Sequence, residues 1–132
     1  YDGSEEMIYK ARQRFSKPMF KKTNLNHWRE KKQFNIIYSM EFLYYLEDPK
    51  AFICLTCEKN LKDNGMFIAG IDHYLENKSS LKWSKDLNVK MQTKKIEEWK
   101  NYLKIAGLRN IKHEQINQKE NWNGTLIFYG EK

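Results

Sequence analysis

The chain has 132 residues, of which 40% are hydrophobic, 14% aromatic and 31% charged. This composition is typical of one compact soluble domain and excludes a disordered tail. No apolar run approaches the ~20 residues that cross a bilayer, and the first residues lack the basic-then-apolar pattern of a secretory signal. Neither a membrane span nor secretion is therefore expected.

Lysine and arginine outnumber aspartate and glutamate by 24 to 17, which gives a net charge of +7. A positive surface attracts phosphates, so RNA binding or RNA methylation is one interpretation, and it predicts a steep fall of affinity with salt. The basic residues are spread along the chain, with no cluster denser than the pairs Lys21-Lys22 and Lys31-Lys32. A general compositional bias is thus favoured over a nucleic-acid partner.

The two cysteines, Cys54 and Cys57, are separated by two residues. A zinc site would need two more ligands, and the histidines stand alone at unrelated positions. We therefore expect no metal, and we expect reduced thiols in a cytoplasmic protein.

The first predicted helix begins after Ser4, an N-cap residue followed by two glutamates, and Pro18 ends it. Four apolar residues recur at helical spacing, so one face of the helix should be buried. These residues are Met7, Ile8, Ala11 and Phe15. A short extended segment is expected over residues 19–23.

Two apolar runs, residues 34–38 and 66–71, predict buried strands. Residues 39–46 should form a short helical turn, and a helix is expected from Asp48-Pro49 to Asn64-Gly65. The right-handed crossover rule makes the two strands parallel neighbours.

Residues 72–92 lack periodicity and predict a long connection, which is more often functional than idle. A third helix is expected from a Thr93 cap to Gly107, with Ile96, Trp99 and Leu103 on one face. Strands over residues 109–116 and 124–129 should form an antiparallel hairpin. Alternating strands and helices predict an α/β fold, which binds ligands beyond the carboxyl ends of its strands.

The order of motifs resembles the class I S-adenosylmethionine-dependent methyltransferases. Four segments carry this resemblance: an acidic strand end with a Ser-x-x-Met helix start, a fourth strand with its turn, a turn that begins the fifth strand, and an antiparallel tail. In this sequence they are YDGSEEMIYKA (1–11), FNIIYSMEFLYYL (34–46), LKDNGMFI (61–68) and residues 93–132 with Ala106-Gly107-Leu108. The resemblance implies a Rossmann-like class I methyltransferase sheet, mostly parallel, with a C-terminal antiparallel hairpin.

The family holds the methionine end of its cofactor with a glycine-rich turn after the first strand, and this sequence has no such turn. We therefore expect residues 1–132 to be a single partial methyltransferase domain, truncated before the first strand and first helix. The interior sheet edges left in this way must be paired. A missing N-terminal segment or a swapped copy of the chain is the expected partner, and the isolated fragment is expected to be inactive.

The resemblance implies that S-adenosylmethionine lies against the first strand ends. Asp2 would accept hydrogen bonds from the ribose, or simply favour the helix dipole. Met7 would lie against the adenine, and core packing is the alternative. Asn24 would accept from the adenine amino group, or be an ordinary loop residue. The full set of cofactor-binding candidates is Asp2, Gly3, Ser4, Met7, Asn24, Leu25, Ser39, Met40 and Glu41.

The methyl acceptor is expected beside the fourth and fifth strands. His73 could take a proton from the acceptor, with Tyr74 beside it, although lone histidines are usually structural. The substrate-binding candidates are Tyr44, as a ring face for a cation, Asp72, and Trp83, as a lid or simple core cover.

Methyl transfer from a sulfonium is an in-line displacement, so alignment and water exclusion can supply most of the catalysis and no metal is required. The expected function is therefore methyl transfer to a small-molecule or undetermined acceptor. The Asn-Pro-Pro-Tyr signature of adenine or glutamine methylation is absent after residues 34–38. The alternative is a noncatalytic methyltransferase-like module that binds a protein partner through its open sheet edge.

Overall fold

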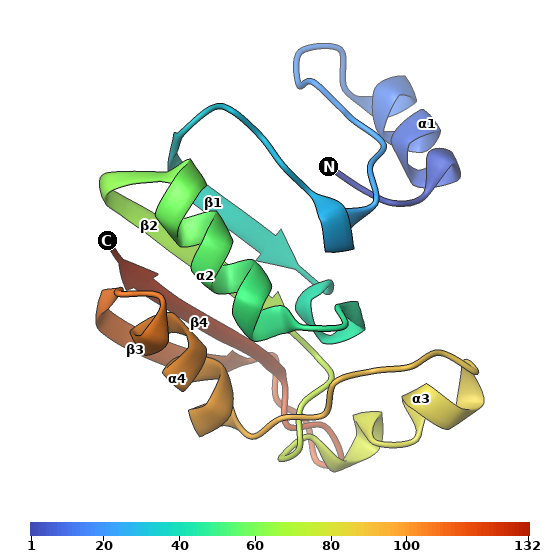
Figure 1. The fold of residues 1–132 in the computed structure, drawn as a ribbon. Helices are drawn as coiled ribbons and strands as arrows, with labels where there is room; N and C mark the ends of the chain where they lie inside the picture. Colours follow the sequence, from blue (N-terminus) through green and yellow to red (C-terminus); the bar gives the residue numbers. More distant parts are fainter. The chain divides into compact units, whose positions relative to one another are not determined.

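The computed structural model describes all residues 1–132, and the chain divides into two compact units, Tyr1–Glu30 and Lys31–Lys132. Figure 1 traces the chain through both units from the N- to the C-terminus. None of its helices combines the length and the apolar composition that a membrane span needs.

The smaller unit contains the helix α1 (Glu5–Arg14) and the 3-10 turn η1 (Leu25–His27). The predicted N-cap is confirmed, because the Ser4 hydroxyl accepts a hydrogen bond from the Met7 N–H at 3.3 Å. The predicted buried face is largely wrong: Ile8 is buried, but Met7 and Phe15 are more than half exposed. The single isolated bridge between Asp2 and Lys22 is the only strand pairing in this unit, so the unit itself has no sheet surface to cover that face.

The larger unit is built on a four-stranded sheet in the order β1-β2-β4-β3. Its strands are β1 (Phe34–Met40), β2 (Leu61–Ile71), β3 (Arg109–Ile116) and β4 (Thr125–Glu131). The predicted parallel pairing of β1 with β2 is confirmed, and so is the antiparallel hairpin of β3 and β4. β4 also pairs antiparallel with β2, so the sheet is mixed and open.

The helix α2 (Pro49–Asn60) joins β1 to β2, and its predicted start at Asp48-Pro49 is confirmed. Its predicted end at Asn64-Gly65 is wrong, because the chain enters β2 directly after Asn60. Asn64 instead adopts a left-handed φ of 57° within the strand. The pairing of β1 with β2 shifts register at this point, so the Asn-Gly pair marks a strand irregularity and not a helix cap.

The helix α4 (Ile96–Ile105) begins two residues later than predicted, with Lys95 and not Thr93 at the N-cap. The Glu98 carboxylate accepts from the Lys95 N–H at 2.9 Å and closes the first turn. Thr93 does not cap the helix, because its hydroxyl is hydrogen-bonded to the His73 ring. A tertiary contact has thus replaced the local cap that the sequence favours.

Residues 72–95, between β2 and α4, contain two short elements, η3 (Lys78–Ser80) and α3 (Trp83–Asp86). A further 3-10 turn, η2 (Leu43–Tyr45), follows β1 as predicted. The Gln92 N–H donates to the Tyr44 carbonyl at 2.7 Å, so the connection after β2 is fastened to the turn after β1.

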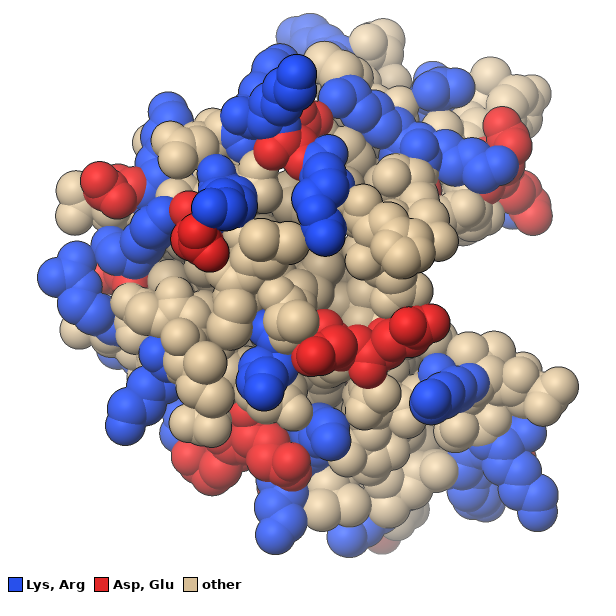
Figure 2. Space-filling view, in the orientation of Figure 1, with Lys and Arg blue, Asp and Glu red and all other residues tan.

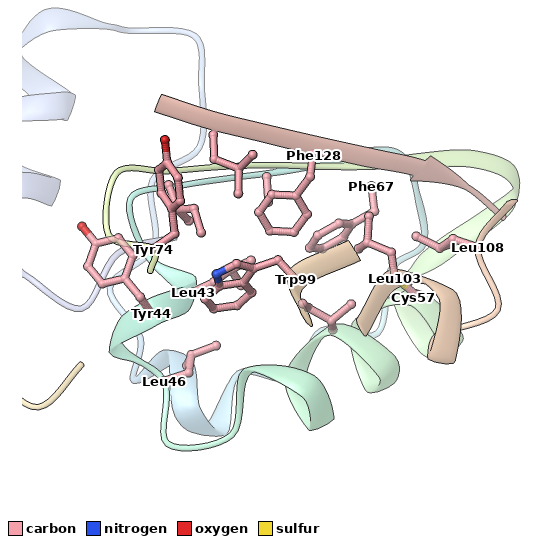
Figure 3. Close-up of a cluster of buried hydrophobic side chains, with 14 of the residues drawn as sticks. Leu43, Tyr44, Leu46, Cys57, Phe67, Tyr74, Trp99, Leu103, Leu108 and Phe128 are labelled. Atoms are coloured by element: carbon pink, nitrogen blue, oxygen red, sulfur yellow. The ribbon is translucent and has the colours of Figure 1, made fainter. Parts of the chain in front are cut away.

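The hydrophobic core of the larger unit lies between the sheet and the helices α2 and α4, which cover the same face (Figures 1 and 3). Trp99 is fully buried at its centre, with its ring centroid 5.8 Å from that of Phe128. The prediction that residues 34–38 form a buried strand is wrong for alternate residues, since Ile36 and Tyr38 are 62% and 61% exposed. β1 is an edge strand of this sheet, and only one of its faces is packed within the unit.

Candidate functional site at the ends of β1 and β2

The carboxyl ends of the parallel strands β1 and β2 bring two acidic residues to one edge of the sheet. Glu41 follows β1 directly, and Asp72 follows β2 directly. Met40 pairs with Gly70, and the Glu41 N–H donates to the Gly70 carbonyl at 2.9 Å. Parallel neighbours end in the same direction, which is why residues 31 positions apart in the sequence meet here.

The Tyr44 hydroxyl orients the Glu41 carboxyl group. The Tyr44 hydroxyl donates to Glu41 Oε2 at 2.8 Å, while Glu41 Oε1 is buried and has no partner. Burial raises the pKa of Glu41 to about 7 and the nearby Asp72 carboxylate adds to the rise, whereas the Tyr44 hydroxyl and the Asp72 backbone N–H oppose it. Burial also raises the pKa of Tyr44, so this hydroxyl stays protonated and acts as a donor.

Two further polar oxygens at this edge are buried without a partner: Asp72 Oδ1 and Ser39 Oγ. Ser39 lies in β1 beside Ala69 of β2, two residues before Glu41. A buried polar atom left unpaired costs about 1–3 kcal/mol, so native proteins rarely keep such atoms without a reason. Their concentration where the two strands end is typical of a ligand site.

His73 lies beneath this edge and is fully buried. Its Nδ1 lies 3.0 Å from the Ser80 carbonyl and its Nε2 lies 2.7 Å from the Thr93 hydroxyl. A carbonyl oxygen only accepts, so Nδ1 carries the proton and Nε2 accepts from Thr93. Burial lowers the pKa of His73, which keeps the ring neutral. Its two hydrogen bonds fasten the start of the connection after β2 to Ser80 and to Thr93 further along the same connection.

Tyr74 is fully buried, and its hydroxyl lies within 3.0 Å of the carbonyls of Asn123 and Gly124. Gln115 Nε2 donates to the same hydroxyl at 2.9 Å. Burial raises the pKa of Tyr74. This side chain therefore fastens the end of β2 to the loop of the β3–β4 hairpin.

A row of aromatic rings runs from η2 to that hairpin loop. The Tyr44 ring centroid lies 4.4 Å from that of Tyr45 and 5.5 Å from that of His73. The half-buried Trp83 stacks between His73, at 6.3 Å, and Trp122, at 5.9 Å. Trp83 thus lies next to the candidate site, where either predicted role, acceptor wall or core cover, is compatible with its packing.

The smaller unit holds the residues predicted to contact the nucleoside. The Thr23 N–H donates to the Asp2 carbonyl at 2.9 Å, so the segments that end at Asp2 and at Thr23 run side by side and parallel. Asp2 Oδ1 accepts from the Ser4 N–H at 2.7 Å, and Asn24 Oδ1 accepts from the Asn26 N–H at 3.1 Å. Asp2 and Asn24 therefore stand at the carboxyl ends of neighbouring segments. Asp2 Oδ2 and Asn24 Nδ2 take no part in these bonds.

The remaining sequence candidates lie as follows. Met7 is 54% exposed, which leaves its thioether outside any core. Gly3 is exposed, and a Cβ there would make only an ordinary contact, at 3.7 Å from the Thr23 carbonyl. Leu25 is half-buried in η1, and Met40 is exposed at the end of β1 with its sulfur over Gly70.

Three residues that sequence reasoning missed hold this arrangement together: Asn77, Ser80 and Thr93. Asn77 is fully buried, and its Nδ2 donates to the Asp72 carbonyl at 2.8 Å while its Oδ1 accepts from the Asn123 N–H. No periodicity or motif marks Asn77 or Thr93, because the partners of Asn77 lie 5 and 46 residues away and that of Thr93 lies 20 residues away.

The basic residues do not gather into a stripe on the face shown in Figure 2, where lysine and arginine are scattered and interspersed with acidic groups. This face therefore gives no support to the nucleic-acid interpretation. Among the residues described, 1–132, no group of three or more His, Cys, Asp and Glu side chains is placed to hold a metal ion.

Known structures share this fold. A chain of the Haloferax volcanii complex between the Trm112 methyltransferase activator and a protein assigned as a methyltransferase superposes with a TM-score of 0.82 at 21% identity, over 98% of this chain and 69% of that one. An S-adenosylmethionine-dependent methyltransferase from Thermotoga maritima gives 0.80 at 18% identity, over 98% and 70% of the two chains. The N-methyltransferase NodS from Bradyrhizobium japonicum, solved with S-adenosylhomocysteine, gives 0.66 at 17% identity, over 99% and 64%.

No protein-family model and no curated protein sequence matches the chain. The fold is nevertheless that of the class I S-adenosylmethionine-dependent methyltransferases: a Rossmann-like sheet that ends in antiparallel strands. The resemblance predicted from the motif order is thus confirmed at the level of the fold.

Proposed function

We propose that this protein is an S-adenosylmethionine-dependent methyltransferase. The observation that carries the proposal is the group of unpartnered buried oxygens of Ser39, Glu41 and Asp72 where β1 and β2 end. In open α/β sheets this edge is where ligands bind. The same fold in a solved methyltransferase that holds S-adenosylhomocysteine supports the choice of cofactor.

The residues of the smaller unit suit the nucleoside part of that cofactor. Asp2 offers carboxylate oxygens for a ribose diol, and Asn24, on the neighbouring parallel segment, offers an amide for the adenine edge. Met7 is exposed and can lie against a purine ring. Gly3, Ser4 and Leu25 complete this group, with Ser4 holding both Asp2 and the start of α1.

The residues of the larger unit suit the methyl acceptor. The bound cofactor supplies an electrophilic methyl group on a sulfonium, and the chain's own residues align the acceptor and exclude water. Ser39, Met40 and Glu41, the cofactor-binding candidates of this unit, line the strand ends with Asp72, where the sulfonium and the acceptor would meet, and Tyr44 and Trp83 remain the aromatic candidates for the acceptor. We propose that His73 and Tyr74 position this edge through their buried hydrogen bonds; His73 could act as the base only if its bond to Thr93 opened.

The test of this proposal is the binding of S-adenosylhomocysteine to the full-length protein. We expect the ligand to raise the melting temperature, and we expect Asp2→Ala to remove most of that rise and to weaken binding at least tenfold, about 1.4 kcal/mol. Calorimetric titration measures the affinity. Asp63→Ala, which removes an exposed carboxylate in β2, is the matched control and should bind like the wild type.

A second candidate is a noncatalytic module that binds a protein partner. The exposed apolar side chains of the edge strand β1, Ile36 and Tyr38, favour it. This candidate predicts no stabilisation by S-adenosylhomocysteine. If the ligand does not change the melting temperature of the wild type, the methyltransferase proposal is contradicted and the noncatalytic module is favoured.

A further inference from the structure

The carboxyl groups of Glu41 and Asp72 share one edge of the sheet without a positive partner. The ion pairs of the larger unit join Lys59 to Glu58 and Lys100 to Glu97, far along the chain from these two groups. The titratable groups that influence Glu41 are Tyr44, a neutral donor, and Asp72, a second acid. Ionising both carboxyl groups at this edge without a counter-charge is costly, so the pair lacks a positive partner.

The geometry also says which atom of Glu41 is free to meet a ligand. Oε2 is fixed by the Tyr44 hydroxyl at 2.8 Å, whereas Oε1 is buried and has no partner. Asp72 Oδ1 is likewise buried without a partner. Tyr45, which is 41% exposed, packs against the Tyr44 ring at 4.4 Å and offers a π-face to a cation beside the donor to Glu41. A donor with positive charge would satisfy both oxygens and complete the charge balance.

We propose that the methyl acceptor is an amine that enters as its ammonium ion, and that Glu41 is the catalytic residue that receives its proton. This inference rests on the proposed methyltransferase function and names the substrate class of the same site. Asp72 holds the cationic head beside Glu41, and Tyr44 keeps the Glu41 carboxyl group oriented.

The step balances without any further reactant. The ammonium N–H bond breaks, its proton goes to Glu41 Oε1, and the nitrogen keeps the lone pair. That lone pair forms a bond to the sulfonium methyl carbon as the carbon–sulfur bond breaks, and the electrons of the broken bond stay on sulfur as a neutral thioether. The product leaves as a methylated ammonium, and the Glu41 proton passes to solvent.

Other occupants fit less well. A neutral hydroxyl acceptor would fill one hydrogen bond but would bring no positive charge of its own to the two carboxyl groups. A divalent cation needs about six oxygen ligands, and the described residues contain no group of three ligating side chains. A protonated amine supplies both the hydrogen-bond donors and the positive charge with one functional group.

The first experiment compares binding of phenethylamine with that of 2-phenylethanol, its neutral isostere, to the full-length protein with S-adenosylhomocysteine present. We expect the wild type to bind the amine at least tenfold more tightly. Glu41→Gln keeps an acceptor for Tyr44 but not the charge, so it should erase this preference when both proteins are saturated with S-adenosylhomocysteine. Glu120→Gln, in the exposed hairpin loop, should behave like the wild type.

The second experiment follows transfer of a tritiated methyl group from S-adenosylmethionine to phenethylamine as a function of pH. At saturating cofactor, we expect Glu41→Gln to lower kcat at least 100-fold and to remove the dependence on pH near neutrality. Glu41→Asp should recover part of the rate. His73→Gln should keep the pH dependence.

Each failure points to a different conclusion. Equal binding of amine and alcohol, a preference that survives Glu41→Gln, or binding of Mg²⁺ alone in place of the amine would overturn the amine assignment while the methyltransferase stands. A pH dependence lost in His73→Gln and kept in Glu41→Gln would give the base role to His73. No binding of S-adenosylhomocysteine by the wild type would overturn both proposals.

Discussion

The two units of this chain differ in what holds them together. In Tyr1–Glu30 only two apolar side chains, Ile8 and Trp28, are buried, whereas every residue of the contiguous core lies in Lys31–Lys132. The smaller unit relies on local backbone bonds and on exposed ion pairs such as Lys22 with Glu5, which contribute little. The larger unit buries a sheet face under two helices.

The two units also differ in the part of the cofactor or substrate that their candidate residues are proposed to bind. The candidates for nucleoside binding lie in the unit with little buried surface, and the candidates for acceptor chemistry lie in the unit with the core. Ligand-binding segments are commonly drawn from the less stable parts of proteins, where ordering by the ligand is part of the binding equilibrium. The smaller unit should therefore gain more order from a bound nucleoside than the larger one.

The largest expected effect is the loss of a core tryptophan. Trp99→Ala removes a fully buried ring that packs on Phe128 and Tyr102, so it should lower the free energy of unfolding by about 3–5 kcal/mol. Trp28→Ala, in the smaller unit, removes a ring that contacts Tyr1 and should leave the main unfolding transition nearly unchanged. Urea unfolding followed by circular dichroism measures both.

Hydrogen exchange on the same two variants sharpens the comparison. Trp28→Ala should speed exchange at amides of Tyr1–Glu30 and leave the β2 and β4 amides protected. Equal destabilisation by the two substitutions would show that the two units unfold as one and do not differ in stability.

The next effect in size concerns two glycines of the larger unit that share a left-handed backbone. Gly124 has a φ of 84°, and a Cβ there would collide with the Ile116 carbonyl, whereas Gly107, with a φ of 82°, faces open space. We expect Gly124→Ala to cost about 3 kcal/mol and Gly107→Ala about 1 kcal/mol. Thermal unfolding measures the pair, and equal losses would mean that the hairpin loop yields to the added methyl.

The Gly124 variant also tests the support of the site. The Gly124 carbonyl accepts from the Tyr74 hydroxyl at 2.9 Å, and Tyr74 is the third residue after β2, next to His73 in the sequence. A displaced hairpin loop should therefore weaken amine binding, while Gly107→Ala, beyond the end of α4, should not.

Sequence patterns predicted the elements whose signals are local. Asp48-Pro49 starts α2 as expected, because a side-chain cap and a proline act within one turn. Thr93 failed as a cap because its hydroxyl has a better partner in His73, 20 residues away. Asn64-Gly65 was misread because the same dipeptide serves a helix end or a strand irregularity, and only pairing with β1 decides between them.

The sequence predicted which acidic residues follow the two parallel strands, but not the surroundings of their carboxyl groups. The end of each strand could be read from the apolar runs, so Glu41 and Asp72 were placed at one edge. The loss of solvent around Glu41 Oε1 depends on side chains from η2 and from the connection after β2, and no spacing in the sequence encodes that packing.

The smallest effect is a pH-dependent gain in stability when Glu41 loses its charge. The pKa of Glu41 is about 7 in the folded chain, against about 4.3 when unfolded, so the folded state binds more protons between these values. Stability contributed by this group is full at low pH and is lost as the pH rises through 7. Glu41→Gln does not titrate, so its stability relative to the wild type should increase from pH 5 to pH 8, by about 1–2 kcal/mol after allowance for partial solvation and the added amide N–H.

Urea midpoints at pH 5, 6, 7 and 8 for the wild type, Glu41→Gln and Glu120→Gln measure this difference. The lowered pKa of His73 makes every variant less stable as the pH falls below about 6.5, but that contribution is common to all three proteins and cancels in the comparison. A gain in Glu41→Gln that is the same at every pH would mean that the Glu41 carboxyl group is solvated in the folded protein. In that event the two units would still differ in packing, but an ammonium ion would gain nothing by pairing with Glu41, because that carboxylate would already be stabilised by water.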